Sequence, residues 1–136
     1  MNFFQKLFGS KKSNFDKIVA ARVTGIDKHP NADRLRVIKL DVGGSVVEPV
    51  VCGAFNFGVG DMVALALPGA TIPQSIHGAD HKPFVLEKAT IRGVESQGML
   101  CASYELKLGP LSEKPEIALL KNDIKAGSEF DSNMIK

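Results

Sequence analysis

Two short blocks contain the residues of this chain whose types and spacing could do chemistry. They are residues 29–35 (HPNADRL) and residues 91–101 (IRGVESQGMLC). Both combine turn formers and small residues with side chains that hydrogen-bond polar ligands or bind phosphates. Neither block sets a nucleophile beside a base. We therefore expect a surface that holds RNA and no machinery for breaking bonds.

Known catalytic and metal motifs are not found in the sequence. Ser96 lies in Glu-Ser-Gln-Gly, which is not the Gly-x-Ser-x-Gly nucleophile elbow, and the chain has no Walker-type phosphate loop. His77 and His81 are four residues apart, but Gly78 and Pro83 argue against the helix that this spacing needs. The three histidines and two cysteines match no standard metal site. We expect no catalytic residue, no metal and no cofactor.

An RNA-binding surface is better supported by the residue types. Basic side chains near the first block would contact phosphates, and amide and hydroxyl groups would bind 2′-hydroxyls or the backbone. Phe55 and Phe57 are candidate stacking rings, worth about 1–3 kcal/mol per base. The predicted RNA-binding residues are Lys28, Asn31, Arg34, Arg36, Phe57, Arg92, Ser96, Gln97 and Met99.

Each candidate also has a structural interpretation. Asn31 and Asp33 could cap a turn by bonding backbone amides. Met99 could be an ordinary core residue, the two phenylalanines could seal one end of a barrel, and Arg92 could be a solvated strand residue. Taken singly these interpretations are favoured, and it is the joint occurrence of the candidates that indicates RNA binding.

Composition and charge restrict the class of protein. The chain has 136 residues, of which 44% are apolar, and a net charge of +2. Its first fifteen residues include three lysines and no acid, so the remainder is near neutral. RNA binding must therefore come from a local patch. No apolar run has the length of a membrane span. Cys52 and Cys101 are widely spaced, which favours reduced thiols in a cytoplasmic protein, with one disulfide as the alternative.

Two regions are expected along the chain. Residues 1–14 read as an amphipathic leader and linker, with an apolar face followed by GSKKSN. The leader could pack on its own domain, drive self-association or touch a membrane surface. Residues 15–136 read as one domain.

The predicted domain is all-β. The five expected strands cover residues 18–26, 35–42, 46–52, 62–67 and 84–91. Gly43-Gly44 marks a hairpin, and Pro49 indicates an edge or a bulge. A short helix is expected in part of 97–106, and a further strand in 117–120. This pattern predicts a five-stranded OB-fold barrel with a short helix and a C-terminal extension.

Several blocks in order resemble a known family, the OB-fold tRNA-binding domain near the N-terminus of bacterial phenylalanyl-tRNA synthetase beta subunits. Related domains occur in free-standing dimeric tRNA-binding proteins and at the C-terminus of many methionyl-tRNA synthetases. The resemblance spans residues 16–130 and is carried by residues 29–35, 51–54 (VCGA), 60–61 (GD), 64–70 (ALALPGA) and 91–101.

The resemblance implies binding to the folded tRNA body, with Asn31, Arg34, Ser96 and Met99 in contact and no aminoacylation chemistry in the domain. Phe55 departs from the family, which usually has proline there. Met1 and the unrelated leader favour a free-standing relative that binds tRNA as an auxiliary to aminoacylation. Its possible protein partners are a second copy of the chain, as a homodimer, or the subunits of an aminoacyl-tRNA synthetase. The alternatives are a domain of a phenylalanine–tRNA ligase beta subunit, or a protein-interaction module that binds no RNA.

Overall fold

The computed structural model describes residues 15–76, 80–111, 113–114 and 116–136. The predicted leader, residues 1–14, lies outside these residues. In the described part the regular secondary structure is almost entirely β-strand, joined by turns and loops. None of the helical segments described has the length and apolarity needed to cross a bilayer. The elements are β1 (Ile18–Lys28), β2 (Arg36–Asp41), β3 (Val46–Cys52), β4 (Met62–Ala66), β5 (Thr71–Ile72), β6 (Phe84–Val85), β7 (Ala89–Ile91), β8 (Val94–Ser96), β9 (Met99–Leu100), β10 (Leu119–Leu120) and the 3-10 turn η1 (Ser132–Met134).

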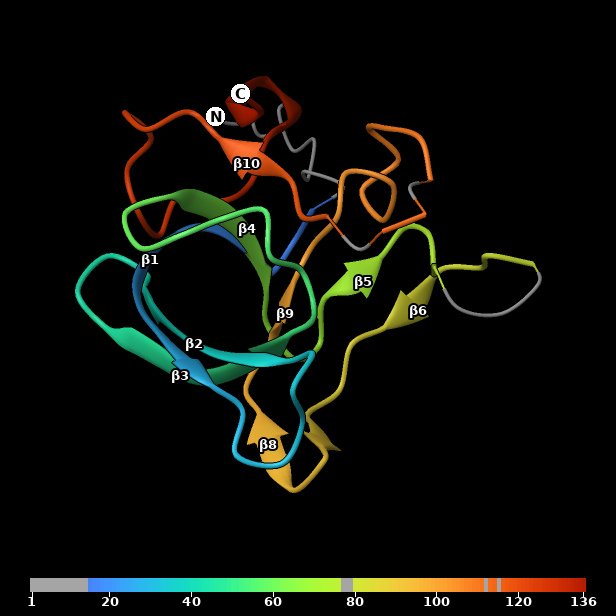
Figure 1. The fold of residues 1–136 in the computed structure, drawn as a ribbon. Helices are drawn as coiled ribbons and strands as arrows, with labels where there is room; N and C mark the ends of the chain where they lie inside the picture. Colours follow the sequence, from blue (N-terminus) through green and yellow to red (C-terminus); the bar gives the residue numbers. More distant parts are fainter. Residues whose placement is uncertain (1–14, 77–79, 112, 115) are drawn as a thin grey trace.

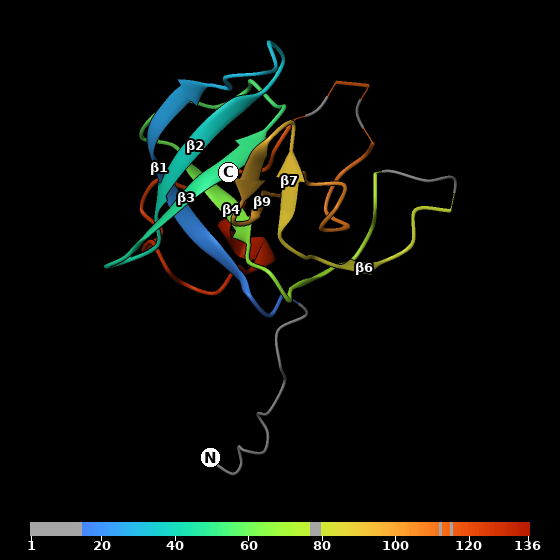
Figure 2. The same ribbon diagram turned by 90° about the horizontal axis from the view of Figure 1, so that it is seen from below.

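The largest sheet is antiparallel, with strand order β10-β4-β1-β2-β3 and β9 also paired to β4. Its strands β1, β2 and β3 lie side by side in Figure 2. The long strand β1 serves both halves of this sheet, because residues 18–22 pair with β4 and residues 22–28 pair with β2. The β1–β2 register shifts between Val23 and Gly25, and such irregularities bend a strand. The sheet curls accordingly, so that β1 to β4 form the ring seen in Figure 1.

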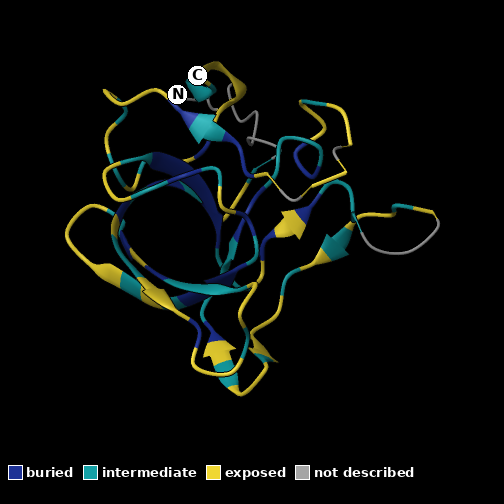
Figure 3. Cartoon of the chain, in the orientation of Figure 1, coloured by how far each residue is buried: buried dark blue, intermediate teal, exposed yellow. Residues whose placement is uncertain are grey.

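Hydrophobic clusters lie on both faces of β4, which is buried along its whole length. On one face, Val63 and Leu65 pack with residues of β2 and β3, and we call this group the inner cluster. On the other face, Ala64 and Ala66 belong to the second group, which we call the outer cluster. Small side chains on this outer side let another segment approach the strand closely. In Figure 3 the buried part of the ribbon accordingly follows β4 and the adjoining part of β1.

The C-terminal segment covers the outer cluster. The Phe130 N–H donates to the Ile18 carbonyl, and the Ala20 N–H donates to the Ser128 carbonyl, both at 2.8 Å. The buried Phe130 ring meets the Phe15 ring edge to face, with centroids 4.9 Å apart. The expected C-terminal extension is therefore part of the domain core.

The open side of the ring is held by two hydrogen bonds between β3 and the β8–β9 connection. The Gln97 N–H donates to the Pro49 carbonyl, and the Val51 N–H donates to the Ser96 hydroxyl, both at 2.9 Å. No β-ladder joins β3 to β9 among the described strands. The predicted mostly-β, antiparallel architecture is confirmed. The described strands do not form a continuous ladder around a barrel.

The first four predicted strands are confirmed, with small shifts at their ends. The Gly43-Gly44 turn between β2 and β3 is also confirmed, with φ values of 84° and 107°. Pro49 lies in the edge strand β3, where the register with β2 shifts, so both of its expected properties are found. The strand expected over 117–120 is shorter and forms β10.

Two predicted elements are wrong. Residues 84–91 do not form one strand of the main sheet: β6 pairs with β5, and β7 pairs with β8 in a separate hairpin. The helix expected within 97–106 is replaced by β9 and a series of turns at 103–107. Met99 and Leu100 extend to pair with β4, and the Glu105 carboxylate accepts the Ala102 N–H at 2.8 Å, which closes a turn instead of a helix.

Replacing Gly98 by alanine should destabilise the domain by roughly 1–3 kcal/mol, the usual cost of overpacking. A Cβ at this position would lie 2.7 Å from the Ala66 carbonyl oxygen and 3.0 Å from Leu65 Cδ1. Chemical denaturation measures the free energy of unfolding. Gly58→Ala is the matched control, since a Cβ there meets nothing within 4 Å. Equal stability of the two variants would contradict the proposed close approach.

Candidate nucleic-acid interface

The two blocks singled out in the sequence meet at the ring of His29, which is only 4% exposed. Its Nδ1 accepts the Asn31 N–H at 3.0 Å, and its Nε2 lies 2.9 Å from the Ile91 carbonyl oxygen. Because Nδ1 is the acceptor, the proton belongs on Nε2, which donates to Ile91. The neutral ring thus joins the 29–35 loop to the end of β7.

A second pair of contacts links the same loop to the β7–β8 turn. The Asn31 side-chain amide donates to the Arg92 carbonyl at 2.9 Å, and the Arg92 guanidinium lies 3.4 Å from the Asn31 carbonyl. Arg92 and Gly93 have φ values of 52° and 93°, as a tight hairpin turn with two left-handed residues requires. A Cβ on Gly93 would lie 3.2 Å from the Asn31 amide nitrogen, so glycine permits this approach.

An open hollow of about 320 Å³ lies between the loop and the turn, lined by Asn31, Ala32, Asp33, Arg34, Leu35 and Arg92. Arg34 and Arg92 are exposed, as is Lys28 at the end of β1. The side chains of Arg34 and Lys28 make no hydrogen bond or ion pair within the described ranges. The Asp33 carboxylate at the rim lowers the net positive charge. The arrangement presents free cations to a polyanion.

Arg36 is held differently from the other predicted cations. Its guanidinium carbon lies 4.6 Å from the ring centroids of both Phe55 and Phe57. Its Nη2 donates to the carbonyls of Ala54 and Phe57 at 3.2 and 3.1 Å. Phe57 is 6% exposed and Phe55 is 56% exposed. In this conformation Phe57 offers no free ring face, and the exposed ring is that of Phe55.

The remaining predicted residues lie on or beside the β8–β9 connection. The Ser96 hydroxyl accepts the Val51 N–H and donates to the Gly98 carbonyl, both at 2.9 Å, and Ser96 is 3% exposed. The Gln97 side chain is partly exposed, with Glu95 oxygens 3.4 Å away. Met99 is partly buried against the outer cluster. The contacts of Ser96 and Met99 are therefore internal ones.

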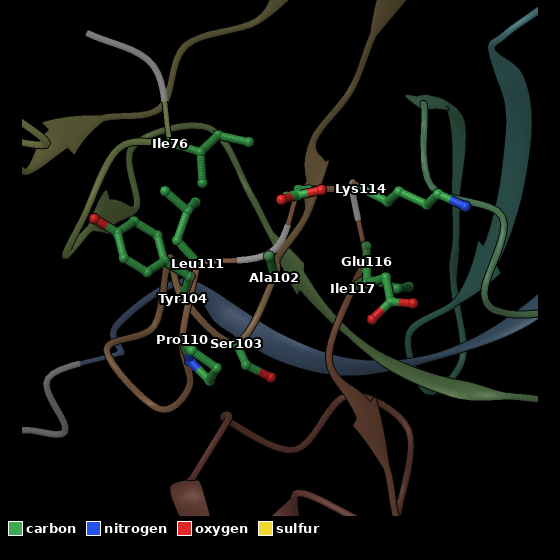
Figure 4. A pocket seen from close by; sticks show the side chains of 10 residues that line it. Ile76, Ala102, Ser103, Tyr104, Pro110, Leu111, Lys114, Glu116 and Ile117 are labelled. Carbon is green, nitrogen blue, oxygen red and sulfur yellow. The ribbon is translucent and has the colours of Figure 1, made fainter. Parts of the chain in front are cut away.

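A larger hollow of about 650 Å³ lies away from both blocks, beside the turns that follow β9. Tyr104 and Leu111 lie on one side of it, and Lys114 and Glu116 on the other (Figure 4). None of the predicted RNA-binding residues lines it. A shallow cationic rim suits a nucleic-acid backbone better than this pocket does, because phosphate contacts are made at exposed cations.

The cysteines and histidines form no metal centre in the described part of the chain, where no group of three potential ligands is found. His77 lies outside the described residues. Cys52 and Cys101 are both buried, and neither forms a disulfide within the described residues. Burial raises the pKa of each thiol above its usual value, and for Cys52 the nearby Arg36 partly opposes this rise.

Two residues that matter to this site were not selected from the sequence. His29 is not among the predicted RNA-binding residues. Its place before Pro30 in the first block is the signal that could have revealed its bridging role. Phe55 is a candidate stacking ring together with Phe57, but only Phe57 is among the predicted RNA-binding residues. The exposure of Phe55 relative to that of Phe57 depends on the position of Arg36, which the sequence does not show.

The family described as "Putative tRNA binding domain" matches residues 18–129. The chain is 44% identical over 116 residues to a phenylalanine–tRNA ligase beta subunit of Ralstonia nicotianae. The aligned residues cover 85% of this chain and 14% of that protein. The corresponding subunit of Bdellovibrio bacteriovorus is 39% identical over 121 residues, covering 89% and 14%. The chain thus spans about one seventh of these curated relatives.

The fold is also found in a solved structure. The crystal structure of the C-terminal domain of Plasmodium vivax p43 superimposes with a TM-score of 0.53 at 20% sequence identity. The superposition covers 87% of this chain and 64% of the other chain.

Replacing Ser96 by alanine should lower the free energy of unfolding by about 1–3 kcal/mol, because the buried Val51 N–H loses its acceptor. Urea denaturation of the full chain measures this loss. Ser45→Ala, in the exposed β2–β3 turn, is the control and should change stability by less than about 0.5 kcal/mol. An unchanged midpoint for Ser96→Ala would show that the hydroxyl is not needed there.

Stability should fall as the pH rises above the ordinary thiol pKa of 9.0. The unfolded chain releases thiol protons there while the folded chain retains them, because burial raises the pKa of both cysteines. Deprotonation therefore favours the unfolded state. The experiment is urea denaturation from pH 7 to pH 10.5. A Cys52→Ala/Cys101→Ala protein, measured against its own value at pH 7, should lose less stability than the wild type.

Proposed function

Since the chain belongs to the tRNA-binding domain family, we propose that it binds structured tRNA at the joined 29–35 loop and β7–β8 turn, as a non-catalytic auxiliary to aminoacylation. The site of action would be the cytoplasm, where tRNA is charged. Its curated relatives include phenylalanine–tRNA ligase beta subunits, which suggests a role beside such an enzyme or as one of its domains.

The observation that carries this proposal is that some residues of the joined loop and turn hold the backbone in place, while others stay exposed. His29 and Asn31 hold the two blocks together by hydrogen bonds, while Arg34 and Lys28 remain exposed and unpaired within the described ranges. A rigid frame that leaves cations free is suited to the phosphate backbone, which provides most of the affinity of sequence-independent RNA binding.

The predicted residues take different parts in this proposal. Lys28, Arg34 and Arg92 would contact phosphates, and the exposed edge of Asn31 together with Gln97 would reach 2′-hydroxyls or phosphate oxygens. Ser96 and Met99 would hold the β8–β9 connection in place. Three cations form a small patch, so a second copy of the chain or a synthetase subunit would raise affinity by adding contacts.

Arg34→Glu should weaken the binding of bulk tRNA roughly tenfold at low salt, because it replaces a phosphate contact by a repulsive charge. It should also reduce the slope of log affinity against log salt concentration by about 1. Titration by fluorescence anisotropy at several salt concentrations measures both quantities. Arg34 is exposed and unpaired in the described part of the chain, so thermal stability should be unchanged.

Lys125→Glu makes the same charge change at an exposed residue of the C-terminal segment, next to Ala126, whose carbonyl lies against Gly43 of the β2–β3 turn. This control should bind tRNA as the wild-type chain does, apart from a small general charge effect. Equal weakening by both variants would contradict a site at the 29–35 loop. No binding by the wild-type chain at low salt would instead favour a protein-interaction module.

A further inference from the structure

Phe55 presents a large aromatic surface to solvent, with 56% of its surface exposed. Its side chain projects from the loop between β3 and β4, and one side of the ring is occupied by Arg36. When its surroundings hold an exposed ring in one orientation, the ring loses little conformational entropy on binding. It can therefore bind a flat partner well.

Arg36 supports the Phe55 ring from behind. The guanidinium carbon lies 4.6 Å from the centroid of each of the Phe55 and Phe57 rings, and Nη2 donates to two carbonyls of the same loop. Its Nε is buried and has no partner within the described residues, while Arg36 as a whole is partly exposed. The contact with Phe57, which belongs to the inner cluster, ties the guanidinium to the domain core.

The loop that carries Phe55 is fixed on its C-terminal side. The Asn56 side chain exchanges two hydrogen bonds of 3.0 Å with the backbone of Ile117. The Gly58 N–H donates to the Asp61 carboxylate at 2.9 Å. The ring is therefore held by side-chain stacking and by its own backbone.

The Phe55 loop adjoins the proposed phosphate contacts. A Cβ on Gly53 would lie 3.4 Å from Leu35 Cδ2 and 3.8 Å from the Arg34 carbonyl oxygen. Gly53 is two residues before Phe55, and Arg36 is two residues after Arg34. An RNA strand whose phosphate contacts Arg34 can thus bring a neighbouring nucleotide to the Phe55 ring.

We propose that Phe55 is a stacking site for one unpaired nucleobase of the bound RNA, and that Arg36 is the positioning residue that holds its ring. The proposal rests on the proposed function and adds the kind of nucleotide recognised. A base inside a duplex has both faces covered by its neighbours, whereas an unpaired base in a loop or at an end can stack on an aromatic ring. The site therefore selects single-stranded segments of a folded tRNA.

Phe55→Leu and Phe55→Trp test the ring itself in the full chain. Leucine keeps an apolar side chain without a π-face, and it should lower tRNA affinity about tenfold. Tryptophan should retain the wild-type affinity. Because no phosphate contact is lost, the salt slope of Phe55→Leu should equal that of the wild type, in contrast to Arg34→Glu. Both variants should unfold at the wild-type midpoint, since Phe55 is largely exposed.

A single-stranded octaribonucleotide that contains one 2-aminopurine provides a direct readout of stacking. Binding of the wild-type chain and of Phe55→Trp should quench the base fluorescence, and Phe55→Leu should not quench it at saturation. Arg36→Lys keeps the charge but lacks the planar group that contacts the two rings. It should resemble Phe55→Leu in affinity and quenching. Wild-type behaviour of Arg36→Lys would overturn the positioning role.

The outcomes separate the two proposals. Wild-type affinity and quenching of Phe55→Leu, together with weakened binding by Arg34→Glu, would overturn base stacking and leave the tRNA site standing. Quenching of the oligonucleotide without any affinity for tRNA would support stacking and overturn the proposed function. Failure of the wild-type chain to bind either RNA would overturn both.

Discussion

The candidate interface depends on the hydrogen bonding of one buried imidazole ring. His29 joins segments that are 62 residues apart, because one ring nitrogen accepts from its own loop and the other donates to the end of β7. This arrangement requires the neutral ring with its proton on Nε2. Since the ring and the Asn31 amide anchor the loop, the side chains of Lys28 and Arg34 need no internal partners. Rigidity and free charge are thereby obtained at the same place.

Most polar groups in the two sequence blocks satisfy backbone groups of the protein itself. Ser96 supplies an acceptor to β3, and Asn31 binds the β7–β8 turn. Directly after the first block, Arg36 binds the loop after β3. Irregular backbone has donors and acceptors that a sheet would otherwise pair, and these side chains replace the missing ladder. A ligand-binding surface built from loops therefore needs many polar residues that never touch the ligand.

The predictions from sequence were most accurate where local patterns decide the structure. Strand 46–52 follows directly from its apolar content and the preceding Gly43-Gly44 turn, and it has the bounds expected. Residues 84–91 look equally strand-like, but their partners are β5 and β8, which a local pattern does not show. Ser96 and Phe57 are similar cases: their burial depends on the distant residues Val51 and Arg36. Residue type indicated which side chains could bind RNA, and long-range packing decided which of them remain exposed.

The hydrogen bonds that join β1 to the C-terminal segment have a consequence for synthesis of the chain on the ribosome. Ile18 and Ala20 are among the first described residues to be made, yet their backbone partners Phe130 and Ser128 are made more than a hundred residues later. Until then the outer cluster of β1 and β4 is exposed on the nascent polypeptide. The docking of Phe130 beside Phe15 therefore comes late in the folding of this domain.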